Sequence, residues 1–321
     1  MKKIALIYMG GTFGCVGEPL APMPAEQFLP QLKKILPLHL KVECMVAPAI
    51  QDSSAYMATD WLLLVQQIQH LQLQGYTHFV VIHGTDTLSY AAAVLAHCLG
   101  ESCHVILTGS QYPLLNQQGD NTREFSDARD NLYLALDQVI LLPVGVYLAF
   151  HQQIWHGQTA VKVHSTELAA FRGLTAQQSL DHKPRGFVVQ AEHLQRAENF
   201  NILSWMIQPI HLAQLLQNLQ TLLQHPPAFL VLQAFGTGNL QVNPDIEHCL
   251  QQLYAQGCLT ILSTQVPFGG IDQRYAVSQW LQSGKIIVND CLSAADLYAK
   301  ALQMYLQYPT AEQWLEHWHD Q

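Results

Sequence analysis

Two threonines, an aspartate and a lysine form the most chemically suggestive pattern in this sequence. Thr12 follows two glycines, Thr85 and Asp86 stand directly after an apolar run, and Lys162 lies among small and apolar residues. A threonine hydroxyl is a weak nucleophile near neutral pH and reacts when a base or a proton relay removes its proton. A lysine acts as such a base when burial lowers its pKa or a neighbouring carboxylate fixes its position and charge. The four residues therefore predict a threonine nucleophile assisted by a base.

Each of these residues also has a plainer explanation. Thr12 can be a helix N-cap, Asp86 or Thr87 can cap the helix that follows them, and Lys162 can extend from an apolar strand to water. For any one residue alone, this structural role is the more common one. Their combination favours catalysis over four separate structural roles.

Glycines beside the two threonines strengthen the catalytic prediction. Gly10, Gly11 and Gly84 would let main-chain N–H groups approach a substrate closely. Such N–H groups can form an oxyanion hole, which stabilises the negative charge that develops during acyl transfer.

The elements that must position these residues alternate between strands and helices. Short, almost continuously apolar runs predict buried parallel strands, and the stretches between them have helical length and spacing. The strands are expected at 3–11, 78–84, 104–110 and 144–150, and the helices at 60–74, 86–99 and 125–137. Ligands of such sheets bind beyond the carboxyl ends of the strands, which is where Thr12, Thr85 and Asp86 fall.

The alternation loosens near residue 172 and resumes near residue 201. The expected strands there are 201–209, 228–236, 259–265 and 285–290, with helices at 211–224, 244–256, 274–283 and from about 293. We therefore expect an α/β protein with a larger N-terminal parallel-sheet domain (1–172), a linker (173–201) and a smaller C-terminal α/β domain (202–321).

Composition restricts the partners and the compartment. The chain has 321 residues and a formal net charge of −9, with no basic cluster, which argues against nucleic acid and anionic membranes as partners. Seven cysteines without a C-x-x-C pair favour reduced thiols. The apolar run at the start is too short for a signal peptide, and no stretch approaches the roughly 20 apolar residues of a membrane span. These features predict a cytoplasmic protein.

Several familiar ligand motifs are absent from the sequence. "GGTFG" lacks the spacing of a dinucleotide-binding loop, and no P-loop, G-x-S-x-G or H-E-x-x-H pattern occurs. These absences argue against dinucleotide binding, and the sequence indicates no metal site.

Short motifs spread along the chain resemble those of a known family, the bacterial-type L-asparaginases, and are most similar to its cytoplasmic type I branch. They are "GGT" (10–12), "DSS" (52–54), "HGTDTL" (83–88), "TGSQYP" (108–113), "SDARDNL" (126–132), "AVKVHS" (160–165) and "GTGN" (236–239). The resemblance implies hydrolysis of L-asparagine to L-aspartate and ammonia through a covalent acyl-enzyme, without metal or cofactor. It also implies assembly into homodimers or homotetramers.

The same resemblance assigns roles to individual residues. Thr12 would be the nucleophile, while Thr85, Asp86 and Lys162 would form a second threonine-centred triad. The Thr85 N–H would help to hold the oxyanion, and Asp86 would also face the substrate α-amine. The remaining residues implied to bind substrate are Gly11, Ser53 at the α-carboxylate, Ser54 beside it, Gly84, Ser110, and Asn239, which would reach the site of a neighbouring subunit.

One position departs from the family pattern and keeps alternatives open. The loop after "GGT" normally supplies a tyrosine that activates the first threonine, whereas Leu20 falls near that place here. Tyr275 or a water molecule could take over the role, and Asp272 lies where some branches supply an acidic partner. The alternatives are hydrolysis of a related amide such as glutamine or a D-isomer, and an amino-acid sensor that binds without turnover.

Overall fold

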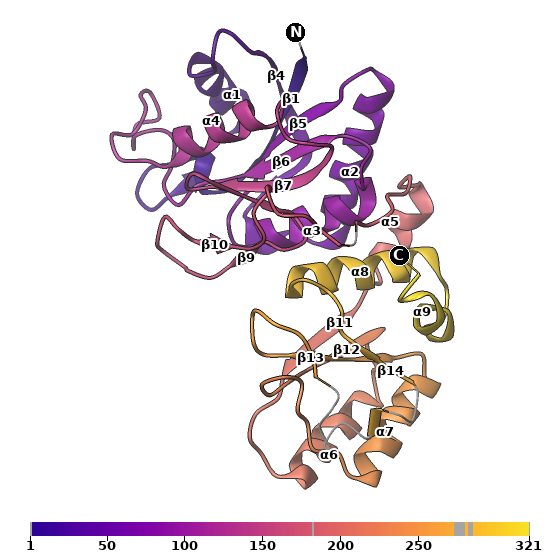
Figure 1. Cartoon of the computed structure of the whole chain (residues 1–321). Helices are drawn as coiled ribbons and strands as arrows, with labels where there is room; N and C mark the ends of the chain where they lie inside the picture. The colour runs from indigo at the N-terminus through magenta and orange to yellow at the C-terminus, as the bar shows by residue number, and fades with distance from the viewer. Residues whose placement is uncertain (1, 182, 273–279, 282–284, 321) are drawn as a thin grey trace. The chain divides into compact units, whose positions relative to one another are not determined.

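The computed structural model describes residues 2–181, 183–272, 280–281 and 285–320. It is an α/β structure with two separate parallel sheets, as the sequence predicts (Figure 1). The helix expected at 274–283 falls almost wholly on residues outside the described part of the chain. None of the described helices has both the length and the apolar composition that crossing a bilayer requires.

The first sheet has six strands in the order β4-β1-β5-β6-β7-β8. Their bounds are β1 Lys3–Gly10, β4 Lys41–Gln51, β5 His78–Ile82, β6 His104–Thr108, β7 Gly145–Phe150 and β8 Gln153–His156. The first five run parallel, and β8 runs antiparallel to β7. The four strands expected from apolar runs are all present, whereas the edge strands β4 and β8 were not expected.

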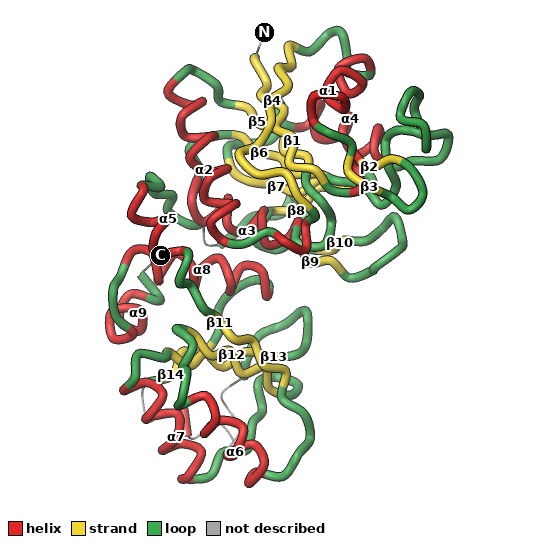
Figure 2. The backbone as a smooth tube through the Cα atoms, turned by 180° about the vertical axis from the view of Figure 1, so that it is seen from behind, coloured by secondary structure: helices red, strands yellow, loops and turns green. Residues whose placement is uncertain are grey.

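Helices cover both faces of this sheet (Figure 2). Their bounds are α1 Ala25–Lys34, α2 Ala58–Leu73, α3 Leu88–Leu99 and α4 Ala128–Gln138. Ile4, Leu6 and Tyr8 of β1 belong to the core that α1 and α4 complete. Ala5 and Ile7 point to the opposite face, where α2 and α3 lie, and are equally buried. Burial on both faces explains why the strand sequence is continuously apolar.

Short elements gather at the carboxyl edge of the first sheet. The chain turns there through the 3-10 helices Thr12–Gly14 and Ser53–Ala55. Two small antiparallel pairs accompany them, β2 Cys15–Val16 with β3 Ala21–Pro22, and β9 Val161–Lys162 with β10 Phe171–Arg172.

The second sheet has four parallel strands in the order β11-β12-β13-β14. Their bounds are β11 Ile202–Met206, β12 Phe229–Ala234, β13 Leu259–Thr264 and β14 Ile286–Val288. The described helices are α6 Leu212–Leu222, α7 Pro244–Ala255, α8 Ala294–Gln307 and α9 Ala311–His317. Separate apolar clusters form on its two faces, one with α6 and α7 and the other with α8 and α9.

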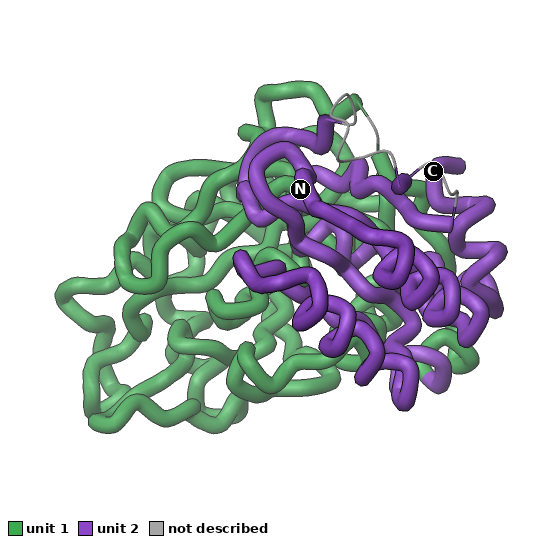
Figure 3. Tube along the Cα trace, turned by 90° about the horizontal axis from the view of Figure 1, so that it is seen from below, with its two compact units in different colours: residues 1–194 green, residues 195–321 purple. Residues whose placement is uncertain are grey.

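The chain divides into two units, Met1–Leu194 and Gln195–Gln321 (Figure 3). This division falls inside the segment 173–201 that the sequence marks as a linker. The segment also holds a short helix, α5 Ala191–Ala197. Each sheet therefore lies within its own unit.

Candidate functional site

Three strand ends of the first unit meet through glycine backbone. A Cβ added at Gly11 would lie 2.4 Å from the Cα of Gly84, and one added at Gly84 would lie 2.6 Å from the Cβ and Oγ of Ser53. Only glycine allows such an approach. The loops after β1, β4 and β5 therefore pack against one another, and Thr12 and Thr85 each follow a glycine of this contact.

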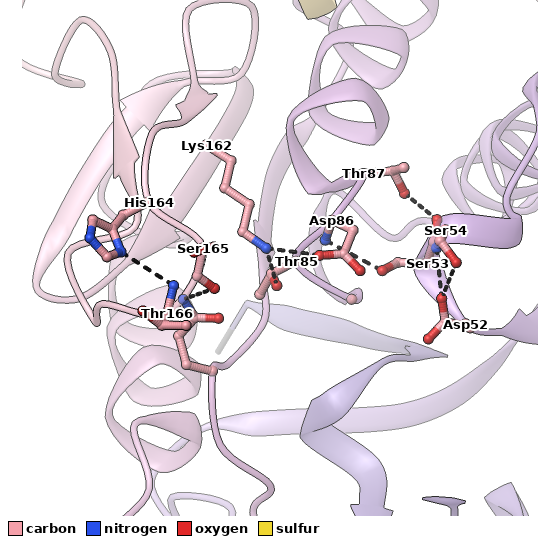
Figure 4. A network of polar contacts seen from close by, with 12 residues as sticks. Asp52, Ser53, Ser54, Thr85, Asp86, Thr87, Lys162, His164, Ser165 and Thr166 are labelled. Carbon is pink, nitrogen blue, oxygen red and sulfur yellow. Dashed lines mark hydrogen bonds and ion pairs between the residues drawn. The ribbon is translucent and has the colours of Figure 1, made fainter. Parts of the chain in front are cut away.

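Lys162 joins the second threonine to the aspartate (Figure 4). Its Nζ lies 2.9 Å from the Oγ1 of Thr85 and 2.9 Å from the Oδ1 of Asp86. Thr85 is buried, the Lys162 side chain is 20% exposed and the Asp86 side chain is 59% exposed. The amine thus links a buried hydroxyl to a carboxylate that faces solvent.

The loop that carries Lys162 is tied down by its neighbours. The side-chain amide of Gln111 donates to the carbonyls of Ser165 and Glu167 at 3.3 and 2.9 Å. His164 Nδ1 accepts the N–H groups of Thr166 and Glu167, so it caps this turn from within. Both sets of hydrogen bonds restrict the backbone of this loop, and therefore the position from which the Lys162 side chain extends.

Ser53 connects the "DSS" turn to the segment that carries Asp86. Its hydroxyl accepts the Asp86 N–H at 3.4 Å, and its carbonyl accepts the Thr87 hydroxyl at 2.6 Å. Asp52 accepts the N–H and hydroxyl of Ser54, and these bonds hold the pKa of the Asp52 carboxyl below its ordinary value. The "DSS" motif therefore forms a rigid turn beside the predicted triad (Figure 4).

The turn after β6 is supported by two buried residues to which the sequence analysis gave no role. The Asp127 carboxylate accepts the N–H groups of Gln111 and Tyr112. Asn131 donates to the carbonyl of Gly109 at 3.0 Å and to Asp127 at 2.9 Å. The spacing of four residues between an aspartate and an asparagine in "SDARDNL", at the start of a helix, was the available signal.

His83 is a second residue that the sequence analysis quoted without a role. It is fully buried, and its ring lies 4.8 Å from the Tyr56 ring, measured between centroids. Its Nδ1 is 2.8 Å from the carbonyl oxygen of Gly84, and its Nε2 is 3.2 Å from the Nε1 of Trp61. Burial lowers the pKa of His83 to about 4, so the ring is neutral at pH 7.

Thr12 begins the 3-10 turn that follows Gly11 and is half-buried. The β2–β3 hairpin continues from this turn, and its tip is fixed by a bond of 2.7 Å from Gln117 to Glu18. Leu20 lies on the hairpin with 52% of its surface exposed. Tyr275, which the sequence suggested as a substitute for the missing phenol, lies outside the described residues.

Ser110 bonds within its own turn, and Asn239 and Asp272 belong to the second unit. The Ser110 hydroxyl is buried and donates to the Tyr112 carbonyl at 2.6 Å, inside its own turn. Asn239 belongs to the second unit, on the loop after β12, where its amide nitrogen lies 3.4 Å from the hydroxyl of Thr237. Asp272 is in the second unit as well, and its N–H donates to the Thr237 carbonyl.

The cluster in the first unit has the parts that acyl transfer needs. It combines the Thr85 hydroxyl, an amine paired with a carboxylate, and closely packed glycine backbone that Thr12 directly follows in sequence. Within the described ranges, no three His, Cys, Asp or Glu side chains are grouped as metal ligands would be.

The chain is similar to known proteins over most of its length. It is 27% identical to a mouse protein named 60 kDa lysophospholipase over 96% of this chain and 58% of the relative. It is 26% identical to L-asparaginase 1 of Escherichia coli K12 over 96% of this chain and 91% of the relative. The chain thus spans little more than half the length of the first of these relatives.

Solved structures share the fold. The thermostable L-asparaginase of Thermococcus kodakarensis superposes with a TM-score of 0.78 at 23% identity, covering 98% of this chain and 96% of that one. The family model described as "Asparaginase, N-terminal" matches residues 3–184, which hold every residue of the cluster around Lys162. The chain belongs to the asparaginase family.

Proposed function

We propose that the protein hydrolyses L-asparagine to L-aspartate and ammonia through an acyl-enzyme on Thr12. The observation that carries this proposal is Lys162, whose Nζ lies 2.9 Å from both Thr85 Oγ1 and Asp86 Oδ1, beside the glycine contact that Thr12 follows. Membership of the asparaginase family and the named relatives support amide hydrolysis as the reaction class.

The first half of the reaction forms an ester. The Thr12 oxygen attacks the side-chain amide carbon, and the carbonyl oxygen becomes an oxyanion held by main-chain N–H groups, including that of Thr85. The C–N bond then breaks, and the amide nitrogen leaves as ammonia after gaining the proton that Thr12 loses. Thr85 and Lys162 relay this proton from Thr12 to the leaving nitrogen, and Asp86 holds the Lys162 amine in place.

The second half returns the free enzyme. Water attacks the ester carbon, the bond to Thr12 breaks, and the products are the aspartate side-chain carboxylic acid and the Thr12 hydroxyl. In this proposal Ser53 contacts the substrate α-carboxylate, and Asp86 contacts its α-amine. Asn239 acts on the site of a neighbouring copy within a homodimer or homotetramer.

Ammonia release with millimolar L-asparagine tests the proposal. We expect turnover in the wild type, and a loss of at least about 10³-fold in kcat for Thr12→Ala and for Lys162→Met. Ser126→Ala is the control for removing a hydroxyl outside the proposed triad, since this hydroxyl donates to the Tyr112 carbonyl at 3.3 Å and accepts the Ala128 N–H at 3.1 Å. Most of the turnover surviving in Thr12→Ala would overturn the assignment of the nucleophile.

The test also separates the remaining alternatives. One methylene in a pocket is worth about 1–3 kcal/mol, so kcat/KM must be compared across L-asparagine, L-glutamine and D-asparagine. Tight binding of asparagine without ammonia release would instead favour a sensor, with Leu20 in place of a phenol as its cause.

A further inference from the structure

His83 occupies the last position before the glycine contact, and the proposed reaction leaves it without a part. It follows β5 directly, and its N–H donates to the Thr108 carbonyl at 2.8 Å. The ring lies near the aromatic rings of Tyr56 and Trp61, at centroid distances of 4.8 and 6.5 Å. A fully buried imidazole with partners at both nitrogens is held in one orientation.

The two partners fix which nitrogen carries the proton. The Trp61 indole nitrogen can only donate, so the Nε2 of His83 must accept that bond. A neutral imidazole then carries its hydrogen on Nδ1, and this hydrogen is donated to the carbonyl of Gly84. The pKa of about 4 agrees with a ring that stays neutral.

The bond to Gly84 determines the direction of the next N–H. The Gly84–Thr85 peptide is trans, because the only cis bond among the described residues is Glu18–Pro19. In a trans peptide the carbonyl and the N–H point in opposite directions. With the Gly84 oxygen anchored on the buried ring, the Thr85 N–H points away from that ring.

This peptide needs such an anchor, because glycine has more backbone freedom than any other residue. On the other side of the peptide, Lys162 bonds the Thr85 hydroxyl and not its N–H. A rotation of the peptide plane would turn the Thr85 N–H without breaking that contact.

We propose that His83 is a positioning residue for the oxyanion: its Nδ1–H holds the Gly84 carbonyl so that the Thr85 N–H stays aimed at the substrate carbonyl oxygen. This rests on the proposed function. His83 touches no substrate and transfers no proton, and its effect falls on kcat, because the oxyanion develops only in the transition state.

Two amide substitutions separate the two bonds of the ring. His83→Asn places an amide N–H near the position of Nδ1 and keeps the bond to Gly84, but it does not reach Trp61. His83→Gln reaches the position of Nε2 and can accept from Trp61, but it does not donate to Gly84. His78→Asn, at the other end of β5, is the control for placing an amide where a buried histidine was.

Loss of one oxyanion donor costs about 10²–10³ in kcat. We expect kcat to fall by about 10²-fold in His83→Gln with KM changed less than about 3-fold. In His83→Asn we expect kcat to stay within about 10-fold of wild type, and in His78→Asn within about 3-fold. Equal kcat values for the folded Asn and Gln variants, or a loss confined to KM, would overturn the proposal.

A spectroscopic measurement tests the geometry even where a variant does not fold. Nitrogen-15 NMR of the wild-type imidazoles reports the tautomer, and we expect an Nδ1–H signal for His83 that persists to pH 5. An Nε2–H tautomer would overturn the positioning role whatever the activity. A wild type that releases no ammonia would overturn the proposed function, while the NMR result would still decide the bond to Gly84.

Discussion

The two parallel sheets of this protein end in different ways at their carboxyl edges. At the first sheet, Lys162 forms an ion pair with Asp86, close in sequence to the contact between Gly11 and Gly84. The Asp86 side chain is 59% exposed. At the second sheet, Asp290 follows β14 and is bound by three partners from the end of the chain. Its carboxylate accepts from Lys300, Trp318 and His319 at 3.0 to 3.3 Å.

The Asp86 carboxylate is accessible to a ligand, whereas the Asp290 carboxylate stabilises the fold. Burial opposes ionisation of Asp290, but the Lys300 ammonium and the bonds from Lys300 and Trp318 hold its pKa below the ordinary value. Trp318 is fully buried in the cluster of α8 and α9, so Asp290 ties β14 to the last helix. The same topology therefore supports a proposed reaction site in one unit and a structural anchor in the other.

Among the variants that test this contrast, we expect the largest effect from a substitution in the contact between Gly11 and Gly84. In Gly84→Ala the new Cβ would stand 2.6 Å from Ser53 and force the loops apart. We expect kcat for asparagine to fall by about 10²-fold, because small misplacement of reacting groups is costly. The measurement is ammonia release beside urea unfolding.

The control for this prediction is Gly75→Ala, between α2 and β5. Gly75 differs from Gly84 in having a positive φ, of 87°, and nothing lies within 4 Å of its added Cβ. We expect a stability loss of about 1 kcal/mol from the backbone strain and a kcat close to wild type. Equal loss of kcat in both variants would show that close packing is not what the site requires.

Much of the fold could be predicted because strands that are buried on both faces consist almost entirely of apolar residues. This holds for β1, β5, β6 and β7, and each of them can be recognised as a strand from its own sequence alone. β4 was missed because it is an edge strand with many exposed side chains. α1 was missed because Pro30 interrupts its pattern.

The candidate site was predictable in residue types but not in contacts. Thr85, Asp86 and Lys162 attract notice singly, yet Lys162 meets Asp86 across 76 positions of sequence, which no local spacing reveals. His83 was overlooked for the same reason, since its partner Trp61 lies 22 positions earlier. The other contacts of the site likewise join residues that are far apart in the sequence and meet only in the folded chain.

Acid should affect the two units differently. All buried histidines among the described residues lie in the first unit. Burial lowers the pKa of both His78 and His83 to about 4, below the ordinary value near 6.5. Between these values the unfolded chain binds protons that the folded unit does not, so stability falls as pH falls from about 6.5 to about 4.

We expect each of these two histidines to contribute a loss of about 1 kcal/mol between pH 6 and pH 5. Hydrogen exchange of peptides from each unit at the two pH values measures it, with His78→Asn as the control that removes one contribution. A pH response in the first unit that is unchanged by His78→Asn would contradict the assignment to this ring.

Asp290→Asn gives the smallest effect and tests the structural anchor. The amide keeps an acceptor for Trp318 but loses the charge that attracts Lys300, whose side chain is 11% exposed. Since the Asp290 side chain is 44% exposed, solvent screens the pair, and we expect a loss of about 1 kcal/mol. The loss should appear as faster hydrogen exchange in α9, and kcat should stay at the wild-type value. A fall in kcat without faster exchange in α9 would mean that Asp290 serves the reaction, and the contrast between an open edge and an anchored edge would then fail.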